Sequence, residues 1–463
     1  MKKLNKTKKK TKIKKHRTKK HKTKKHKTKK QRTKKHKKSN SKIITIKKRK
    51  KHFPKLITVR KSNKQRKIKY ISNTTPKQDT LISEHISKML DVKGRLNNRE
   101  IISKLKSYVP SYDSKIKSLQ TGITNIFGCE DNSIEDFLME DTFIDKFDIS
   151  NYDIKIKVGI NNDGTSICKS WTSKIAKDTL LRNLKYSDTI KCNNIIGPLQ
   201  RNSNCWFNSF FMNFFISDKG RRFFKRFRQC MILGTTFNNQ SISNKKLNKP
   251  LFLLNMAIEA SYNSGELPQK VALGSLMNTN NIINLIYNSL TSKQRKNNRH
   301  LKHSREANNP VNYYTALTNL LNRDSINILE LELDHTFDLI KVFKETFILP
   351  LNKTPEVIIA NIYDDDSRIL KTKKKSFTIN NIHYELDSVV IRDTTEQHFC
   401  SLITCNNKEY AFEGSSFKRI SPFKWKHLLN KNSTFSFNGL ASQLNMVWNF
   451  RKGYQQLFYY RKN

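Results

Sequence analysis

The sequence predicts an α+β protein with two lobes, one helical and one built from β-strands. Between residues 191 and 325, apolar side chains recur at the spacing of helices. After Ser325 the pattern changes to short segments rich in β-branched and aromatic residues, several of which alternate with polar ones. Helices that come first and strands that follow are typical of an α+β domain.

The helical pattern recurs in four stretches, FNSFFMNFFISDKGRRFFKRF (207–227), LFLLNMAIEASYN (251–263), NIINLIYNSLTSK (281–293) and NYYTALTNLLNR (312–323). The first starts with large apolar residues and ends with basic ones, which indicates a helix whose beginning is buried. Strands are expected in five later stretches, INILELELD, EVIIANIYD, YELDSVVIRD, HFCSLITC and KEYAFEG. All of these lie in residues 191–463, which form the main predicted domain.

A strongly basic tail begins the chain. Residues 1–78 hold 37 Lys and Arg and no Asp or Glu, which leaves 54 basic and 37 acidic side chains, a net charge of +17, for residues 79–463. Positions 16–38 repeat every five residues (HRTKK, HKTKK, HKTKK, QRTKK, HKK), a period that fits neither a helix nor a strand. Because like charges repel and little apolar surface is present, we expect a disordered tail. It either binds nucleic acid or another polyanion without sequence preference, or serves only as a solubilising extension.

Residues 79–190 are predicted to form a small, mostly helical accessory region. Apolar residues recur at helical spacing in ISEHISKMLDVKGRLNNREIISKLKSYV (82–109). Asn-Asp-Gly at 162–164 is a turn signal. The pattern of this region does not indicate a function.

The seven cysteines lie at irregular spacing, and no CxxC pair is present, so the sequence does not predict a zinc ribbon. An odd number of cysteines without a secretory signal favours reduced thiols inside the cell. No apolar run approaches the roughly 18–20 residues that would cross a bilayer. We therefore expect a soluble protein of the cytoplasm or nucleus that has no membrane partner.

One cysteine stands where a helix should begin, in QRNSNCWFNS (200–209). Cys205 follows the cap-type residues Ser203 and Asn204, which places its thiol at the positive end of a helix dipole. A thiol becomes a nucleophile as the thiolate, which such a position and a nearby imidazole would favour. Alternatively, Cys205 is a small buried core residue, as free cysteines usually are.

A histidine begins one of the predicted strands. His398 opens HFCSLI, and Glu413 lies near the end of the next strand, KEYAFEG. If these two strands are antiparallel neighbours, the carboxylate of Glu413 would lie beside the imidazole and orient it as in a catalytic triad. Alternatively, His398 is an edge-strand residue that points to solvent.

The stretch QRNSNCWFNS resembles the cysteine box of the ubiquitin-specific proteases, in which a Gly-Asn-Thr-Cys-Tyr-Met-Asn-Ser type run carries the nucleophile. By this resemblance Cys205 is the nucleophile, and Asn208 and Ser209 coincide with the family's own residues. Gln200 takes the place of the Asn that precedes the nucleophile and donates a hydrogen bond to the oxyanion.

YELDSVVIRDTTEQHFCSLI is similar to the same family's histidine box. His398 takes the position of the base, and Glu413 after Phe412 takes the acidic position. Two weaker likenesses follow the family's order along the chain, TPEVIIANIY (354–363) and the closing strand GYQQLFYYR (453–461). The resemblance thus covers most of residues 197–463.

The chain departs from the family's pattern at several positions. Residues 202–204 lack the usual glycine, Gln397 replaces the glycine before the histidine, and Glu413 replaces Asp or Asn. Gln200 replaces Asn, although its amide can still donate from one methylene further out. The family's four-cysteine zinc ribbon has no counterpart. These changes leave open whether the modifier is ubiquitin itself.

The resemblance implies a papain-like cysteine protease fold, with a helical lobe that carries the cysteine and an antiparallel β lobe that carries the histidine. It implies a thiol-dependent hydrolase that cleaves isopeptide or peptide bonds after the C-terminal tail of ubiquitin or a ubiquitin-like protein, through a thioester and without metal or cofactor. The substrate tail would lie in a cleft between residues 197–325 and 325–463. Trp206 would either wall this channel or pack in the core.

Two other functions fit the same residues. A processing protease of the same fold would cut ordinary peptide bonds and ignore ubiquitin. A catalytically silent scaffold would be tethered to nucleic acid by residues 1–78. Frequent Lys, Asn and Ile indicate an AT-rich genome, such as that of a large DNA virus or a protist, and a viral protein would act in the virion or the host cell.

Overall fold

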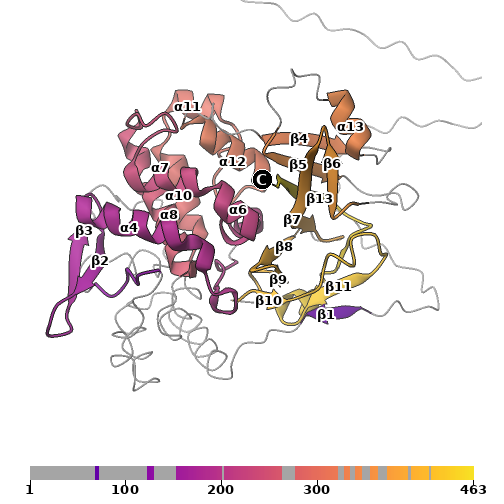
Figure 1. Ribbon diagram of the computed structural model, residues 1–463, viewed down its shortest axis with the longest axis horizontal. Helices are drawn as coiled ribbons and strands as arrows, with labels where there is room; N and C mark the ends of the chain where they lie inside the picture. The colour runs from indigo at the N-terminus through magenta and orange to yellow at the C-terminus, as the bar shows by residue number, and fades with distance from the viewer. Residues whose placement is uncertain are drawn as a thin grey trace, which may run out of the picture. The chain divides into compact units, whose positions relative to one another are not determined.

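Figure 1 shows the computed structural model of the chain, which describes residues 68–71, 123–129, 153–200, 203–262, 277–321, 328–333, 339–346, 355–362, 373–394, 398–416 and 419–462. Every described residue belongs to one compact unit, residues 64–463. These residues have a mixed α/β fold in which the predicted helices precede most of the strands.

The four helices predicted between residues 207 and 323 are present, and the first of them is broken into pieces. Residues 207–227 fall in α5 (Cys205–Phe211), a π-helical turn η5 (Met212–Ile216), α6 (Asp218–Phe223) and α7 (Lys225–Leu233). The break occurs at Ser217, whose backbone is extended. Its side-chain hydroxyl caps α6 by accepting a hydrogen bond from Gly220 N. The other helices of this part are α4 (Lys174–Tyr186), α8 (Asn248–Tyr262), α10 (Thr279–Ser289), α11 (Ser292–Asn297) and α12 (Pro310–Asn319).

The strands form a large, mainly antiparallel sheet in the order β10-β9-β8-β7-β13-β5-β4, with β6 paired to β7. Their bounds are β4 (Ile328–Leu333), β5 (Val357–Ile362), β6 (Ser376–Ile379), β7 (Ile382–Arg392), β8 (Phe399–Cys405), β9 (Lys408–Phe412), β10 (Ser421–Pro422) and β13 (Gln455–Arg461). The five strands predicted after Ser325 are confirmed as β4, β5, β7, β8 and β9. Helix α13 (Leu339–Thr346) lies between β4 and β5 in the chain.

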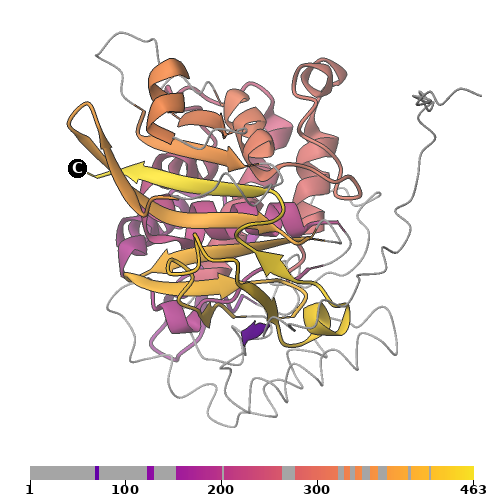
Figure 2. The same cartoon turned by 90° about the vertical axis from the view of Figure 1, so that its right-hand side faces the viewer.

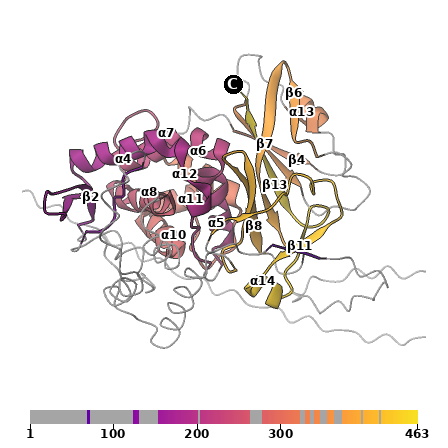
Figure 3. The same ribbon diagram turned by 60° about the horizontal axis from the view of Figure 1, so that its bottom comes forward.

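Both faces of the sheet are covered. Successive residues of β13 alternate between two hydrophobic clusters, with Phe458 and Tyr460 in the cluster of the helices and Leu457 and Tyr459 in the other. This period of two is that of a strand buried on both sides. Figures 1 and 3 show helices α4, α7, α8, α10, α11 and α12 gathered on one side of the sheet, and Figure 2 shows the strands in front of them.

The opposite face carries a smaller sheet, in which β11 (Thr434–Phe437) pairs with β12 (Trp448–Asn449) and with β1 (Lys69–Ile71). A short helix, α14 (Leu440–Gln443), follows β11. Strand β1 lies inside the tail that the sequence predicts to be disordered, so the prediction is wrong for these three residues. The reason is that Ile71 is 3% exposed, in the cluster of β11 and β12. Most of the tail lies outside the described residues.

The described part of the accessory region is less helical than predicted. It contains a hairpin of β2 (Lys155–Ile160) and β3 (Ser166–Ser170), followed by α4. The turn signal at 162–164 is confirmed between these strands, where Gly164 has a φ of +88°. Residues 82–109, predicted to be helical, lie outside the described residues. Ile156 and Leu180 belong to the same cluster as α5 and α8, and the domain boundary at 190/191 stays a prediction.

The prediction of reduced thiols is wrong for four of the seven cysteines. Cys129 pairs with Cys168, and Cys192 pairs with Cys405, while Cys205, Cys230 and Cys400 are free. Irregular spacing in the sequence could not reveal these pairs because the partners lie 39 and 213 residues apart.

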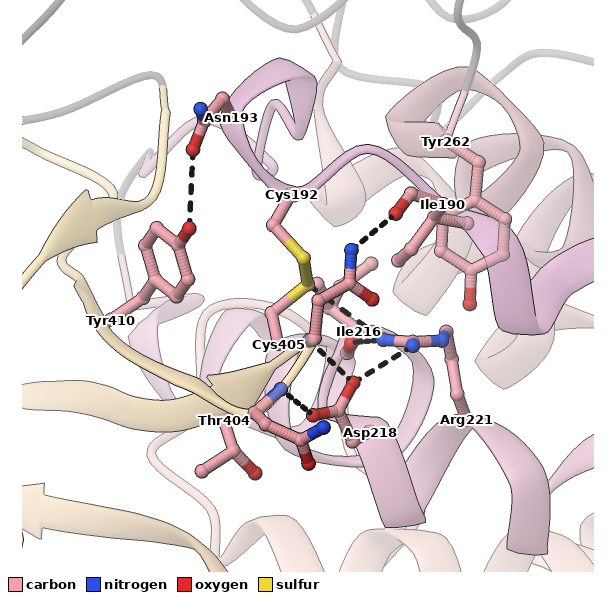
Figure 4. Close-up of a disulfide and its surroundings, with 12 residues drawn as sticks. Ile190, Cys192, Asn193, Ile216, Asp218, Arg221, Tyr262, Thr404, Cys405 and Tyr410 are labelled. Carbon is pink, nitrogen blue, oxygen red and sulfur yellow. Dashed lines mark hydrogen bonds and ion pairs between the residues drawn. A yellow bond between two sulfur atoms is a disulfide. The ribbon is translucent and has the colours of Figure 1, made fainter.

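The second disulfide joins the segment before α5 to the end of β8, as Figure 4 shows. Asp218 lies beside it and accepts from the backbone N–H groups of Asn406 and Asn407 in the β8–β9 turn, at 2.8 and 2.9 Å. Both asparagines have positive φ, as a two-residue hairpin turn requires. Among the described residues, no helix is long and apolar enough to cross a bilayer, and no cluster of His, Cys, Asp and Glu is suited to a metal ion.

Candidate active site

Cys205 is the first residue of α5 and is partly exposed. The six residues after it are all buried, and they anchor the helix in the cluster that covers one face of the sheet. Asn204 precedes the helix, but its side chain makes no capping hydrogen bond, contrary to the prediction from its residue type. Its side-chain amide donates instead to the Leu199 carbonyl and to the Thr279 hydroxyl.

Trp206 lies in the hydrophobic core. The side chain is 1% exposed and packs against Phe207 and Tyr313, with ring centroids 5.6 and 4.9 Å away. Of the two roles considered for this residue, the structure therefore shows core packing. The second position of a buried helix favours this outcome, because it points away from the exposed first residue.

His398 and Glu413 meet through the register of the β8–β9 hairpin. Ser401 pairs with Phe412, so the next position outward brings Cys400 opposite Glu413. His398 lies two residues before Cys400 and shares its face of the sheet, which makes His398 a diagonal neighbour of Glu413. The resulting contact is 2.7 Å between His398 Nε2 and Glu413 Oε1, and the two side chains are 11% and 0% exposed.

Glu413 is held by its own loop as well. Its Oε1 accepts from Ser415 N at 2.7 Å, and its Oε2 accepts from Ser415 Oγ at 2.7 Å and from Ser416 N at 2.8 Å. Burial alone would raise the pKa of this carboxyl, but these bonds and the contact with His398 lower it below its usual value. Glu413 is therefore a buried carboxylate at neutral pH.

Cys205 lies close enough to the imidazole of His398 to act on its pKa. Burial lowers the pKa of His398, but the interactions with Cys205 and Glu413 outweigh it and raise the pKa to about 10. At neutral pH His398 is an imidazolium between the two groups.

The backbone of His398 is fixed by Asp393, which is 2% exposed. His398 N donates to Asp393 Oδ1 at 2.7 Å, and Asp393 N donates to His398 O at 2.8 Å. Trp448 Nε1 donates to the same His398 carbonyl at 3.3 Å. These bonds join the end of β7 to the start of β8 and fix the backbone that carries the imidazole.

Gln200 lies between α5 and the end of β9. Its backbone N–H donates to Gly414 O at 3.1 Å, and its side-chain Oε1 accepts from Asn208 Nδ2 at 3.4 Å. Gly197 allows this loop to approach β9 closely, since a Cβ atom there would lie 2.2 Å from the ring of Phe412. Ser209, the other residue matched to the cysteine box, donates to Cys205 O at 2.9 Å.

The structure thus brings together Cys205, His398, Glu413 and Gln200, which come from three separate segments of the chain, and leaves Trp206 in the core. The sequence reasoning missed Asp393, Ser415 and Ser416. The Ser-Ser pair after Glu413-Gly414 is a signal that could have found two of them, because serines next to a carboxylate often bond to it in a turn. Asp393 at the end of a strand carried no distinctive signal.

Replacing Glu413 by glutamine is expected to weaken folding by about 1–3 kcal/mol at neutral pH, because a buried imidazolium loses its carboxylate partner. The pKa of His398 in the folded chain is raised above its usual 6.5 to about 10. The stabilisation is therefore fully present below about pH 6.5 and is lost as the pH rises through about 10. Urea unfolding at several pH values measures this. Wild type should lose stability between pH 7 and 10 more steeply than the variant, and equal slopes would contradict the proposed pairing.

Comparisons with known proteins give matches in solved structures alone. No family model matches the chain, and no curated protein does. Two structures of the SAGA Ubp8/Sgf11/Sus1/Sgf73 DUB module, one bound to ubiquitin aldehyde, are similar at 12% and 14% identity, over 66% of this chain and 81% and 79% of theirs, with TM-scores of 0.37 and 0.32. An essential yeast splicing factor is similar at 12% identity over 67% of this chain and 83% of its own, with a TM-score of 0.30. A likeness at this level assigns neither a family nor an activity.

Proposed function

We propose that the protein is a thiol-dependent hydrolase of the ubiquitin-specific protease type, which cleaves isopeptide or peptide bonds after the C-terminal tail of ubiquitin or a ubiquitin-like protein. One observation carries the proposal, namely that His398 is hydrogen-bonded to Glu413 and that Cys205 and Glu413 both act on its imidazole and raise its pKa. This is the arrangement of nucleophile, base and orienting carboxylate that acyl transfer by a cysteine requires.

In the first step, the Cys205 thiolate attacks the carbonyl carbon at the end of the substrate tail. Its proton is held by His398, whose charged form Glu413 stabilises. The carbonyl oxygen gains the negative charge of a tetrahedral intermediate. The side-chain amide of Gln200 and the backbone N–H of Cys205, the first of a helix, donate to this oxygen. Loss of one such donor typically costs about 2.7–4 kcal/mol of barrier.

In the second step, His398 gives its proton to the leaving amine, which is a lysine side chain if the bond is an isopeptide. The acyl group then remains on Cys205 as a thioester. Water loses a proton to His398, attacks the thioester and frees the carboxylate and the thiol. The chain's own side chains supply every proton transfer in this cycle.

The proposed architecture is papain-like, with a helical lobe that carries Cys205 and a β lobe that carries His398. It is supported by the place of the two residues, Cys205 at the start of α5 and His398 at the start of β8, each on a different side of the boundary between helices and sheet. The substrate tail would reach the nucleophile between residues 197–325 and 325–463. Trp206 has no part in it, because it is buried.

Ubiquitin that carries a thiol-reactive group at its C-terminus tests the proposal. We expect one adduct, and peptide mapping should find it on Cys205. The other free thiols, Cys230 and Cys400, are buried, and burial raises the pKa of both, which keeps them protonated at neutral pH. They therefore serve as internal controls in the same molecule.

The other outcomes separate the competing functions. Alkylation of Cys205 by a small electrophile without a ubiquitin adduct would favour a processing protease or another modifier. A Cys205 that reacts no faster than Cys230 and Cys400 would contradict the proposal and favour a catalytically silent scaffold. Binding of polyanions by the basic tail stays a prediction in every case.

A further inference from the structure

A buried polar cluster lies beneath the nucleophile. It consists of the side chains of Asn204, Asn208 and Thr279, which are 0%, 3% and 0% exposed, together with that of Gln200. Thr279 begins α10, far along the chain from the cysteine box, and no sequence motif singled it out. Its hydroxyl lies 3.0 Å from Asn204 Nδ2 and 2.8 Å from Asn208 Oδ1, and thereby joins the residues on either side of Cys205.

The directions of these hydrogen bonds follow from one backbone group. The carbonyl of Leu199 lies 3.2 Å from Asn204 Nδ2 and 3.3 Å from Asn208 Nδ2. A carbonyl accepts and never donates, so both amides must turn their NH2 groups toward it. Rotation of either amide by half a turn would instead place two oxygens against each other.

The orientation of Gln200 then follows step by step. Asn204 donates to the Thr279 oxygen, so the one hydroxyl hydrogen of Thr279 goes to Asn208 Oδ1. Asn208 has its NH2 group on the other side, where it donates to Gln200 Oε1. With its oxygen held in this way, the amide of Gln200 presents its NH2 group away from Asn208. The backbone on both sides of this side chain is also fixed, by Leu199 N to Met277 O and by Gln200 N to Gly414 O.

We propose that Thr279 is a positioning residue of the oxyanion hole: its hydroxyl, together with the Leu199 carbonyl, fixes the amide of Asn208, which in turn holds Gln200 with its NH2 group toward the developing oxyanion. This rests on the proposed function, because the oxyanion forms only if Cys205 attacks a carbonyl. Thr279 itself touches no reacting atom. A hydroxyl is needed at this place because it accepts from one amide and donates to the next, which an aliphatic side chain cannot do.

The test compares two small reagents in the full chain, so that it does not depend on which modifier the protein prefers. Acylation of Cys205 by p-nitrophenyl acetate passes through an oxyanion, whereas alkylation by iodoacetamide does not. The measured quantity is the ratio of the two rates at Cys205, determined by mass spectrometry of its peptide. Because both reactions use the same thiol, the ratio cancels any change in the ionisation of Cys205.

Thr279→Val, which keeps the shape of the side chain, is expected to lower this ratio about 10- to 100-fold, since complete loss of one oxyanion donor typically lowers rates 10²–10³-fold. Thr279→Ser retains the hydroxyl and should stay within about threefold of wild type. Thr318→Val is the matched control, because Thr318 is a buried helical threonine whose hydroxyl donates only to backbone carbonyls. Its ratio should be that of wild type.

A double variant decides whether Thr279 acts through Gln200. Gln200→Ala should lower the ratio at least as much as Thr279→Val, and the two together should lower it no further than Gln200→Ala alone. Two outcomes would overturn the proposal for Thr279 and leave the proposed function standing. In the first, the effects of the two substitutions on the ratio multiply in the double variant. In the second, Thr279→Val leaves the ratio unchanged while Gln200→Ala lowers it. A wild-type Cys205 that reacts with neither reagent faster than Cys230 would overturn both.

Discussion

A Cys205→Ser variant is expected to lose essentially all hydrolysis of a fluorogenic ubiquitin C-terminal amide, by roughly 10⁴- to 10⁶-fold, as other enzymes do without their nucleophile. Serine keeps the size of the side chain, but a hydroxyl does not ionise as a thiol does. The fold should change little, with a free energy of unfolding within about 1 kcal/mol of wild type. Steady-state hydrolysis and urea unfolding measure the two quantities on the same sample.

Cys400→Ala is the matched control for this variant. Cys400 lies on β8 close to Glu413 and Asp393, but it is 1% exposed, and burial together with the charges of these two carboxylates raises the pKa of its thiol well above the usual value. Its removal should leave hydrolysis within a few fold of wild type. Hydrolysis that survives in Cys205→Ser, or that disappears in Cys400→Ala, would refute the assignment of the nucleophile.

Removal of the Cys192–Cys405 disulfide is expected to destabilise the protein more than removal of the Cys129–Cys168 disulfide. The crosslink spans 213 residues, and the chain-entropy treatment gives about 5 kcal/mol for a loop of this length. The Cys129–Cys168 disulfide spans 39 residues and gives about 4 kcal/mol on the same basis. Urea unfolding, followed by the fluorescence of the buried Trp206, Trp425 and Trp448, measures the loss in each double Cys→Ala variant.

The two disulfide variants control each other, since each removes one crosslink and leaves the other. The measurement compares the two losses in the free energy of unfolding. An equal or larger loss for the variant without the Cys129–Cys168 crosslink would show that loop length does not set the size of the loss. Below the unfolding transition, Cys205 should keep its reactivity without the long crosslink. The reason is that Asp218 still binds the β8–β9 turn, while His398 and Glu413 lie at the other end of that hairpin.

The sequence by itself determined most of the helices and strands after residue 204 and the place of Cys205 among them. Helical and strand periodicities placed α8, α10, α12 and five strands because local burial patterns follow the period of each element. The spacing of HFCSLITC and KEYAFEG also allowed the pairing of His398 with Glu413 to be expected, because a two-residue turn between neighbouring strands fixes their register. The resemblance to a cysteine box and a histidine box could also be recognised from the sequence, because each box is a short, contiguous stretch.

Only the tertiary structure decided how distant segments meet. The disulfide partners, the burial of Trp206, the bonds of Asp393 to His398 and the place of Thr279 depend on contacts between elements that the sequence does not order in space. In the sequence, Thr279 is an ordinary threonine at the start of a helix. Its proposed role depends on the contacts of its hydroxyl with Asn204 and Asn208, which only the fold creates. Local patterns report which face of an element is buried, whereas the partner on the other side of that face is set by packing of the whole chain.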